Sequence, residues 1–91
     1  MYIIIVKRVM STMLILKRIN KTTEYIEAYY IPENSNEEGY IKIRLSDDEV
    51  VAKKLTSYDG TIETYFTMAR NKLWRIKNDV NLPIETKVMW Y

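Results

Sequence analysis

The stretch IETYFTMARNKLWRI, residues 62–76, decides the fold that this sequence predicts. Its apolar side chains recur at intervals of three and four residues, so at about 100° per residue they line one narrow stripe of an α-helix. The stripe consists of Ile62, Tyr65, Phe66, Ala69, Leu73 and Ile76. Asp59 and Gly60 can supply a cap and a turn before it, and Asn78 can end it. A helix with one apolar stripe needs a second layer to pack on.

The remaining apolar segments are short and rich in β-branched residues, which is typical of strands. Residues 20–23 supply turn residues between an apolar segment that begins at residue 13 and a second one that ends before Pro32. Residues 40–45 alternate between polar and apolar side chains, so one face of this strand is expected to meet the core. The side chains expected to face the core there are Ile41, Ile43 and Leu45. The expected segments are a hairpin over 13–31 and strands over 40–45, 49–55 and 86–91, with a short helix as the alternative for 49–55.

Together these elements predict a single α+β domain, an antiparallel sheet of four to five strands with one amphipathic helix packed on one face. The order is β-β-β-β-α-β, and the place of the first strand stays open. Residues 5–9 repeat the pattern of residues 15–19, but the link between them lacks the Gly, Asn or Asp of a tight turn. Residues 1–12 are therefore either an extension, since Met13 could also start translation, or a strand that pairs with a second copy through residues 2–9.

The composition removes most catalytic chemistry. The chain has neither Cys nor His, so it has no disulfide, thiolate nucleophile, imidazole base or Cys-containing zinc site. The acidic runs Glu37-Glu38 and Asp47-Asp48-Glu49 lack the spacing of a calcium loop. We therefore predict no enzyme activity, no catalytic or metal-binding residue and no cofactor.

The first residues do not have the order of a secretory signal, because six apolar residues come before the bases Lys7 and Arg8. No stretch approaches the roughly 20 apolar residues of a membrane span. We expect a cytoplasmic protein without a membrane partner.

The net charge of +2 hides an uneven distribution along the chain. Residues 1–21 carry five bases and no acid, residues 22–49 carry eight acids and two bases, and the remainder carries seven bases and four acids. Oppositely charged neighbouring strands can complement one another across a sheet. A nucleic-acid-binding surface usually shows a stronger overall bias, so a protein is the partner expected first.

One helix covers one face of such a sheet, and the other face meets water or a partner. Tyr40, Lys42 and Arg44 share the face away from the core, and Tyr25 and Tyr29 share a face of the neighbouring strand. Exposed aromatic side chains can anchor another protein. The leading prediction is a small protein-binding or accessory module that acts through this open face or a strand edge, on a partner protein or on itself as a homodimer.

Two other interpretations of the same residues stay open. In a nucleic-acid-binding protein the tyrosines would stack on bases while Lys42 and Arg44 meet phosphate. Alternatively, tyrosines and long basic side chains simply cover the surface of a strand.

Trp74 is a second candidate, because it lies about 100° around the helix from Leu73 and off the apolar stripe. Arg70 and Lys77 are its neighbours on the helix. A tryptophan flanked by cations is typical of a binding anchor, and packing over the sheet edge or on the C-terminal strand is the alternative.

Several segments also resemble short uncharacterised proteins of low-GC bacteria and their mobile elements. The resemblance rests on residues 39–43, on Glu49-Val50-Val51, on the helix from 65 to 73 and on the closing Trp90-Tyr91. It covers residues 13–91 and implies no role for any particular residue.

Overall fold

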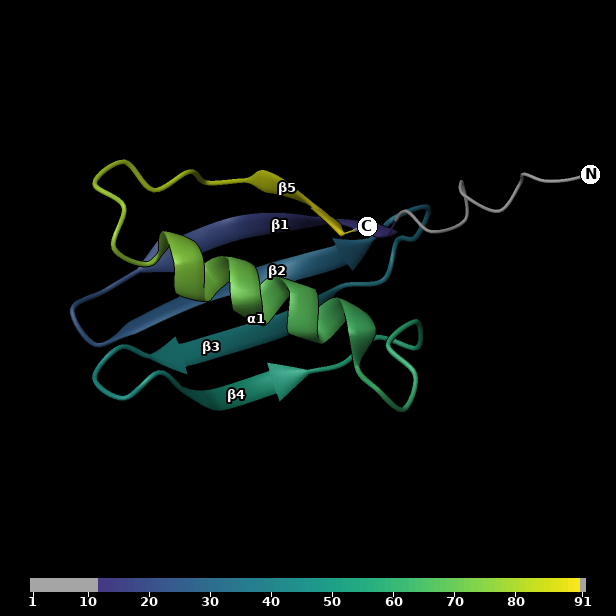
Figure 1. The fold of residues 1–91 in the computed structure, drawn as a ribbon, viewed down its shortest axis with the longest axis horizontal. Coiled ribbons are helices and arrows are strands. Elements are labelled where there is room, and N and C mark those ends of the chain that lie inside the picture. The colour runs from purple at the N-terminus through teal and green to yellow at the C-terminus, as the bar shows by residue number, and fades with distance from the viewer. Residues whose placement is uncertain (1–11, 91) are drawn as a thin grey trace, which may run out of the picture.

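The computed structural model describes residues 12–90, which form a five-stranded antiparallel sheet and a helix that crosses one of its faces (Figure 1). The elements are β1 (Thr12–Lys21), β2 (Tyr25–Pro32), β3 (Gly39–Arg44), β4 (Glu49–Lys54), α1 (Thr64–Ile76) and β5 (Thr86–Trp90). The α+β prediction and the element order are confirmed. The proposed strand exchange through residues 2–9 lies outside the described residues.

The sheet has the strand order β4-β3-β2-β1-β5. Short connections link β1 to β2, β2 to β3 and β3 to β4, and each of these strands pairs with the next one in sequence. Helix α1 then carries the chain back across the sheet, and β5 pairs antiparallel with β1 (Figure 1). The hairpin predicted over 13–31 and the C-terminal strand are confirmed, and residues 49–54 form a strand rather than a short helix. Strands β4 and β5 are therefore the two edges.

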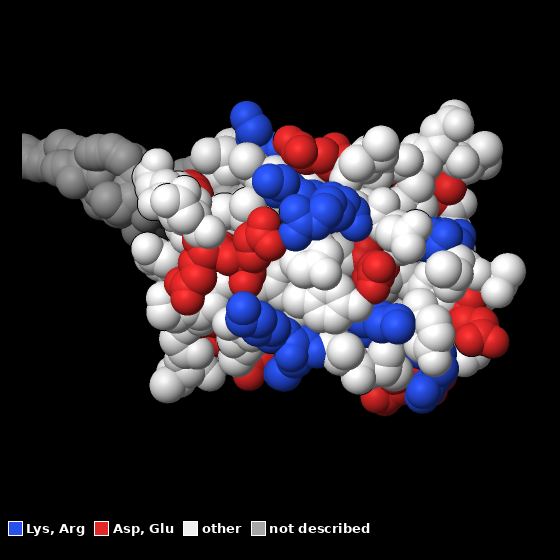
Figure 2. All heavy atoms as spheres, turned by 180° about the vertical axis from the view of Figure 1, so that it is seen from behind, with Lys and Arg blue, Asp and Glu red and all other residues white. Residues whose placement is uncertain are grey.

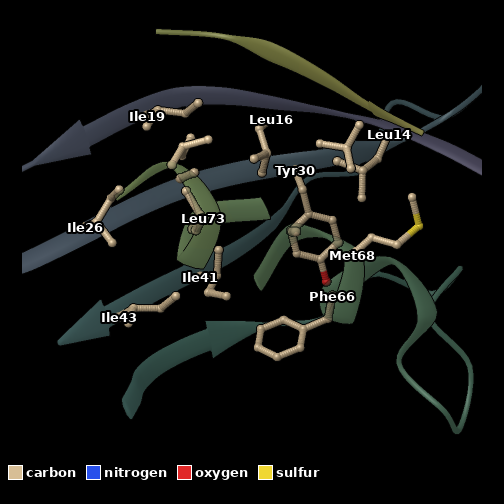
Figure 3. Close-up of a cluster of buried hydrophobic side chains, with 14 residues drawn as sticks. Leu14, Leu16, Ile19, Ile26, Tyr30, Ile41, Ile43, Phe66, Met68 and Leu73 are labelled. Atoms are coloured by element: carbon tan, nitrogen blue, oxygen red, sulfur yellow. The ribbon is translucent and has the colours of Figure 1, made fainter. Parts of the chain in front are cut away.

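The core lies between α1 and the sheet, and alternation along each strand decides which side chains enter it (Figure 3). Ile41 and Ile43 are fully buried and Leu45 packs against the cluster, as predicted. The helix contributes Phe66, Met68, Ala69, Leu73 and Ile76.

Among the side chains that the structure describes, Tyr30 is the largest that is fully buried, and its placement requires a glycine on the neighbouring strand. Tyr30 of β2 lies opposite Gly39 of β3. The ring covers the place where a side chain of residue 39 would stand, since a Cβ there would lie 2.2 Å from the Tyr30 Cζ. The hydroxyl then donates a 2.8 Å hydrogen bond to Oδ2 of Asp59. Only Gly leaves room for this ring.

Asp59 is a buried carboxylate that joins the sheet to the start of α1. Its Oδ2 accepts hydrogen bonds from the amide and hydroxyl of Thr56, at 2.9 and 2.8 Å, as well as from Tyr30. Its Oδ1 accepts the amide of Phe66 at 2.6 Å, one of the free N–H groups in the first turn of the helix. Burial raises the pKa of Asp59, but these hydrogen bonds outweigh it and hold the pKa below the usual 3.8.

The predicted helix start at Ile62 is wrong. Helix α1 begins at Thr64, and Glu63 before it has a left-handed backbone with φ of 53°. The side chain of Ile62 is 79% exposed. Because the Asp59 carboxylate caps the helix from four residues before Glu63, residues 59–63 fold as turns and the helical periodicity does not extend to Ile62. The helix also ends at Ile76, two residues before Asn78.

Candidate functional site

The sheet face opposite α1 carries five of the predicted site residues. Cross-strand pairing sets Tyr29 of β2 beside Tyr40 of β3, and Tyr25 beside Arg44. Lys42 lies between Tyr40 and Arg44 on β3, opposite Glu27. The structure therefore brings together Tyr25, Tyr29, Tyr40, Lys42 and Arg44 on one surface, which we call the open face (Figure 2).

Tyr29 and Tyr40 form an aromatic pair at the centre of the open face. Their ring centroids lie 4.9 Å apart with an interplanar angle of 48°. The Tyr40 hydroxyl donates a 2.5 Å hydrogen bond to Oε1 of Glu27. Desolvation and then this hydrogen bond raise the pKa of Tyr40 to about 12, so the phenol stays protonated at neutral pH. The two rings are half-buried and held in place, as a preformed binding anchor requires.

Arg18 extends this aromatic pair and was not predicted from the sequence. Two residues of β1, Arg18 and Ile19, oppose Ala28 alone on β2, and Arg18 has φ of 52°. This β-bulge breaks the alternation of β1, so that Lys17 and Arg18 both lie on the side of Tyr29 while Ile19 is buried in the core. The Arg18 guanidinium carbon lies 4.1 Å from the Tyr29 ring centroid, and its Nη2 pairs with Glu38 at 2.7 Å. Strict alternation cannot place two adjacent bases on one face, so no sequence signal indicated this contact.

Lys42 and Arg44 are also held by neighbours of the same chain. The Lys42 ammonium lies 4.4 Å from the Tyr25 ring centroid. Arg44 donates two hydrogen bonds to Asp47, from Nε at 3.1 Å and from Nη2 at 2.8 Å. This pairing raises the pKa of Arg44 and lowers that of Asp47. Both cations therefore already have a contact within the chain, Lys42 with an aromatic ring and Arg44 with a carboxylate.

The charge of the open face is mixed. Figure 2 shows basic and acidic side chains around an uncharged central area, without a continuous region of one sign. The pairing pattern places Lys17 and Lys54 beside the tyrosine pair, and Glu27 directly across from Lys42. Two hollows flank Tyr25, one of about 490 Å³ and one of about 90 Å³. The larger is lined by Thr23, Glu24, Tyr25, Arg44, Leu45 and Ser46, and the smaller by Asn20, Thr22, Tyr25, Glu27 and Lys42.

The second predicted group, on α1, lies in the other layer of the molecule. The guanidinium carbon of Arg70 lies 4.6 Å from the ring of Trp74, which is half-buried against the core. Lys77 does not join them, because its ammonium binds the carboxylate of Asp48 in the turn between β3 and β4. Arg70 and Trp74 are thus one unit, and Lys77 ties the helix to the sheet.

The acidic runs Glu37-Glu38 and Asp47-Asp48-Glu49 flank opposite ends of β3, and they form no metal-binding cluster in the part of the chain that the structure describes. Between residues 12 and 90, no three carboxylate side chains are close enough to hold a metal ion. Glu37 instead accepts hydrogen bonds from Ser57, and Asp47 accepts from Arg44. No helix over the same residues has the length and apolarity needed to cross a membrane.

Comparison of the chain with protein-family models, curated proteins and solved structures gave no match. The resemblance to short proteins of low-GC bacteria and mobile elements stays a prediction. Any functional conclusion therefore rests on the geometry of the open face and of the helix.

Proposed function

We propose that this chain is a small protein-binding module that acts through the open face, with Tyr29 and Tyr40 as its central anchor. The observation that carries the proposal is the fixed aromatic pair, half-buried and surrounded by charged side chains of both signs. Protein interfaces combine an aromatic centre with a polar rim in this way. Tyrosine also presents a large contact area at a low cost in conformational entropy.

The charges on the open face favour a protein partner over a nucleic acid. Binding to phosphates needs cations that are free to replace counterions. Here Arg18 is paired with Glu38 and Arg44 with Asp47, and Glu27 would itself face the nucleic acid. A protein surface can supply both an acid for Lys42 and a donor for Glu27.

The face is a better candidate than the β4 edge. Lys53 and Lys54 end this strand, and a register shift near Val51 interrupts its pairing with β3. Lysines and bulges on an edge strand oppose the addition of another strand.

Because the chain has neither His nor Cys, we propose binding rather than catalysis. The absence of cysteine is also consistent with a protein of the reducing cytoplasm, where disulfides are rare.

Affinity capture with matched variants tests the proposal. We expect a partner that binds the native chain and the Arg75→Gln variant, which alters an exposed helix cation, but not the Tyr29→Ser/Tyr40→Ser variant. Thermal melting of each variant separates lost binding from lost folding. A partner that binds the double variant equally well would contradict the proposal.

Solution mass at two concentrations tests whether the partner is a second copy. The full chain is compared with a chain that begins at Met13. A dimer that persists after this truncation but disappears with Tyr29→Ser/Tyr40→Ser means that the open face self-associates. A dimer that the truncation abolishes means association through residues 2–9. Salt-dependent binding to an oligonucleotide, weakened by Lys42→Ala with Arg44→Ala, would favour the nucleic-acid alternative instead.

A further inference from the structure

A groove lies between β4 and α1, on the layer opposite the open face. A five-stranded sheet is about 19 Å across, whereas a helix with its side chains is about 10 to 12 Å wide. Helix α1 packs over β1, β2, β3 and β5, so edge strand β4 projects beyond it. The space left there is about 390 Å³, within the size range of ligand sites. It is lined by Val50, Val51, Ala52, Lys53, Glu63, Phe66 and Arg70.

Apolar side chains and two cations, Lys53 and Arg70, line the groove together. Phe66 is buried, and the Lys53 ammonium lies 4.8 Å from its ring centroid while it pairs with Glu63 at 3.2 Å. Val51 beside them leaves 39% of its surface exposed. The exposed side chain of Val51 therefore offers apolar contact within the groove.

Arg70 is the cation in this groove that lacks an acid. Among residues 12–90 it forms no salt bridge, and its one hydrogen bond is a long 3.4 Å contact to the neighbouring Asn71. Its Nε is shielded from water without any hydrogen-bond partner, and the same holds for the indole nitrogen of Trp74. Shielded donors without acceptors are costly, more so on a charged group. Stacking on Trp74 meanwhile fixes the plane of the guanidinium, which favours two-point binding of a carboxylate.

We propose that this groove binds an acidic, apolar peptide segment of a partner protein, with Arg70 pairing with a carboxylate and an adjacent apolar side chain packing on the exposed Val51. We infer an acidic and apolar ligand because Arg70 is a cation without an acidic partner and the exposed, apolar Val51 lines the same groove. This site is separate from the open face and does not depend on the function proposed there.

Titration of the isotope-labelled full chain with short blocked peptides, followed by NMR, tests the assignment. The probes are acetyl-Leu-Glu-Leu-Glu-amide and its neutral counterpart acetyl-Leu-Gln-Leu-Gln-amide. We expect the Glu peptide to shift the Arg70 Nε–H and the Trp74 indole N–H, and to bind about tenfold or more tightly than the Gln peptide. A Trp74→Phe variant assigns the indole signal.

Three variants decide between a specific contact and a general charge effect. Arg70→Gln is expected to remove the preference for Glu, and Arg70→Lys, which keeps the charge, to retain only part of it. Arg75→Gln removes the same charge from an exposed part of α1 and is expected to leave the preference unchanged. Equal binding of the two peptides, shifts confined to the open face, or an equal loss with Arg75→Gln would each overturn the proposal.

Discussion

Replacement of Gly39 by alanine is the sharpest test of how the core is built. The new Cβ would lie 2.2 Å from Cζ and 2.3 Å from Cε1 of the Tyr30 ring, so the ring has to move. Tyr30 is fully buried, and forcing extra atoms into a packed core costs about 1 to 3 kcal/mol. Movement of the ring also breaks its hydrogen bond to Asp59, which adds about 1.5 kcal/mol or more because the acceptor is charged. We expect the free energy of unfolding to fall by about 2.5 to 4.5 kcal/mol.

Gly60→Ala is the matched control. Gly60 has φ of 65°, and no atom lies within 4 Å of its added Cβ, so only backbone strain of about 1 kcal/mol is expected. Urea denaturation measures both. The double variant Gly39→Ala/Tyr30→Leu, in which the ring is gone, is expected to lose less stability than the sum of its single changes. If Gly39→Ala costs no more than Gly60→Ala, or if the two changes are additive, the account of this core is refuted.

Three further outcomes follow from the same contacts. Asp59→Ala should cost about 3 kcal/mol or more in urea denaturation at neutral pH, since four buried donor groups lose their acceptor. Because the folded pKa of Asp59 is lowered, native stability should also fall as pH drops below about 3.8, and this variant should flatten that fall. Ile62→Ser should change the unfolding free energy by no more than about 0.5 kcal/mol, as calorimetry can check, because the side chain is exposed. Tyr40 should titrate at about 12 by NMR, and Glu27→Gln should lower that pKa.

Burial also predicts behaviour at high pH. Desolvation and the nearby Asp59 raise the folded pKa of Tyr30 above its usual 10.0. Its contribution to stability is therefore complete below pH 10 and is lost as pH rises beyond that value. The loss should be smaller in a Tyr30→Phe variant, measured by urea denaturation across the alkaline range.

Local periodicity was enough to predict the faces of the strands. Along residues 40–45 each apolar side chain is two positions from the next, and in the structure Ile41 and Ile43 are buried while Lys42 and Arg44 lie opposite. The turn residues and Pro32 likewise bounded the first hairpin. These features depend on neighbours in sequence, so the sequence alone contains them.

Features that depend on distant contacts were missed. Arg18 reaches the open face through a bulge that only the pairing of β1 with β2 reveals. The carboxylate of Asp59 caps the helix from outside it, which leaves Ile62 in a turn. Met68 lies off the predicted stripe, yet it is buried, with Val88 of β5 lining the same small cavity. Sequence periodicity predicts which side chains share one stripe of a helix. It does not predict that the sheet is wide enough to bury a side chain beside that stripe, such as Met68.

Site-specific photocrosslinking tests the central claim that the open face binds a protein. A benzoylphenylalanine at position 54, which faces Tyr40 across β3 and β4, is compared with one at Val80, which is 96% exposed and away from the tyrosine pair. In cells that produce the chain, we predict a crosslinked protein from position 54, absent from position 80 and lost with Tyr29→Ser/Tyr40→Ser. The same product from both positions, or its survival without the two tyrosines, would contradict the claim.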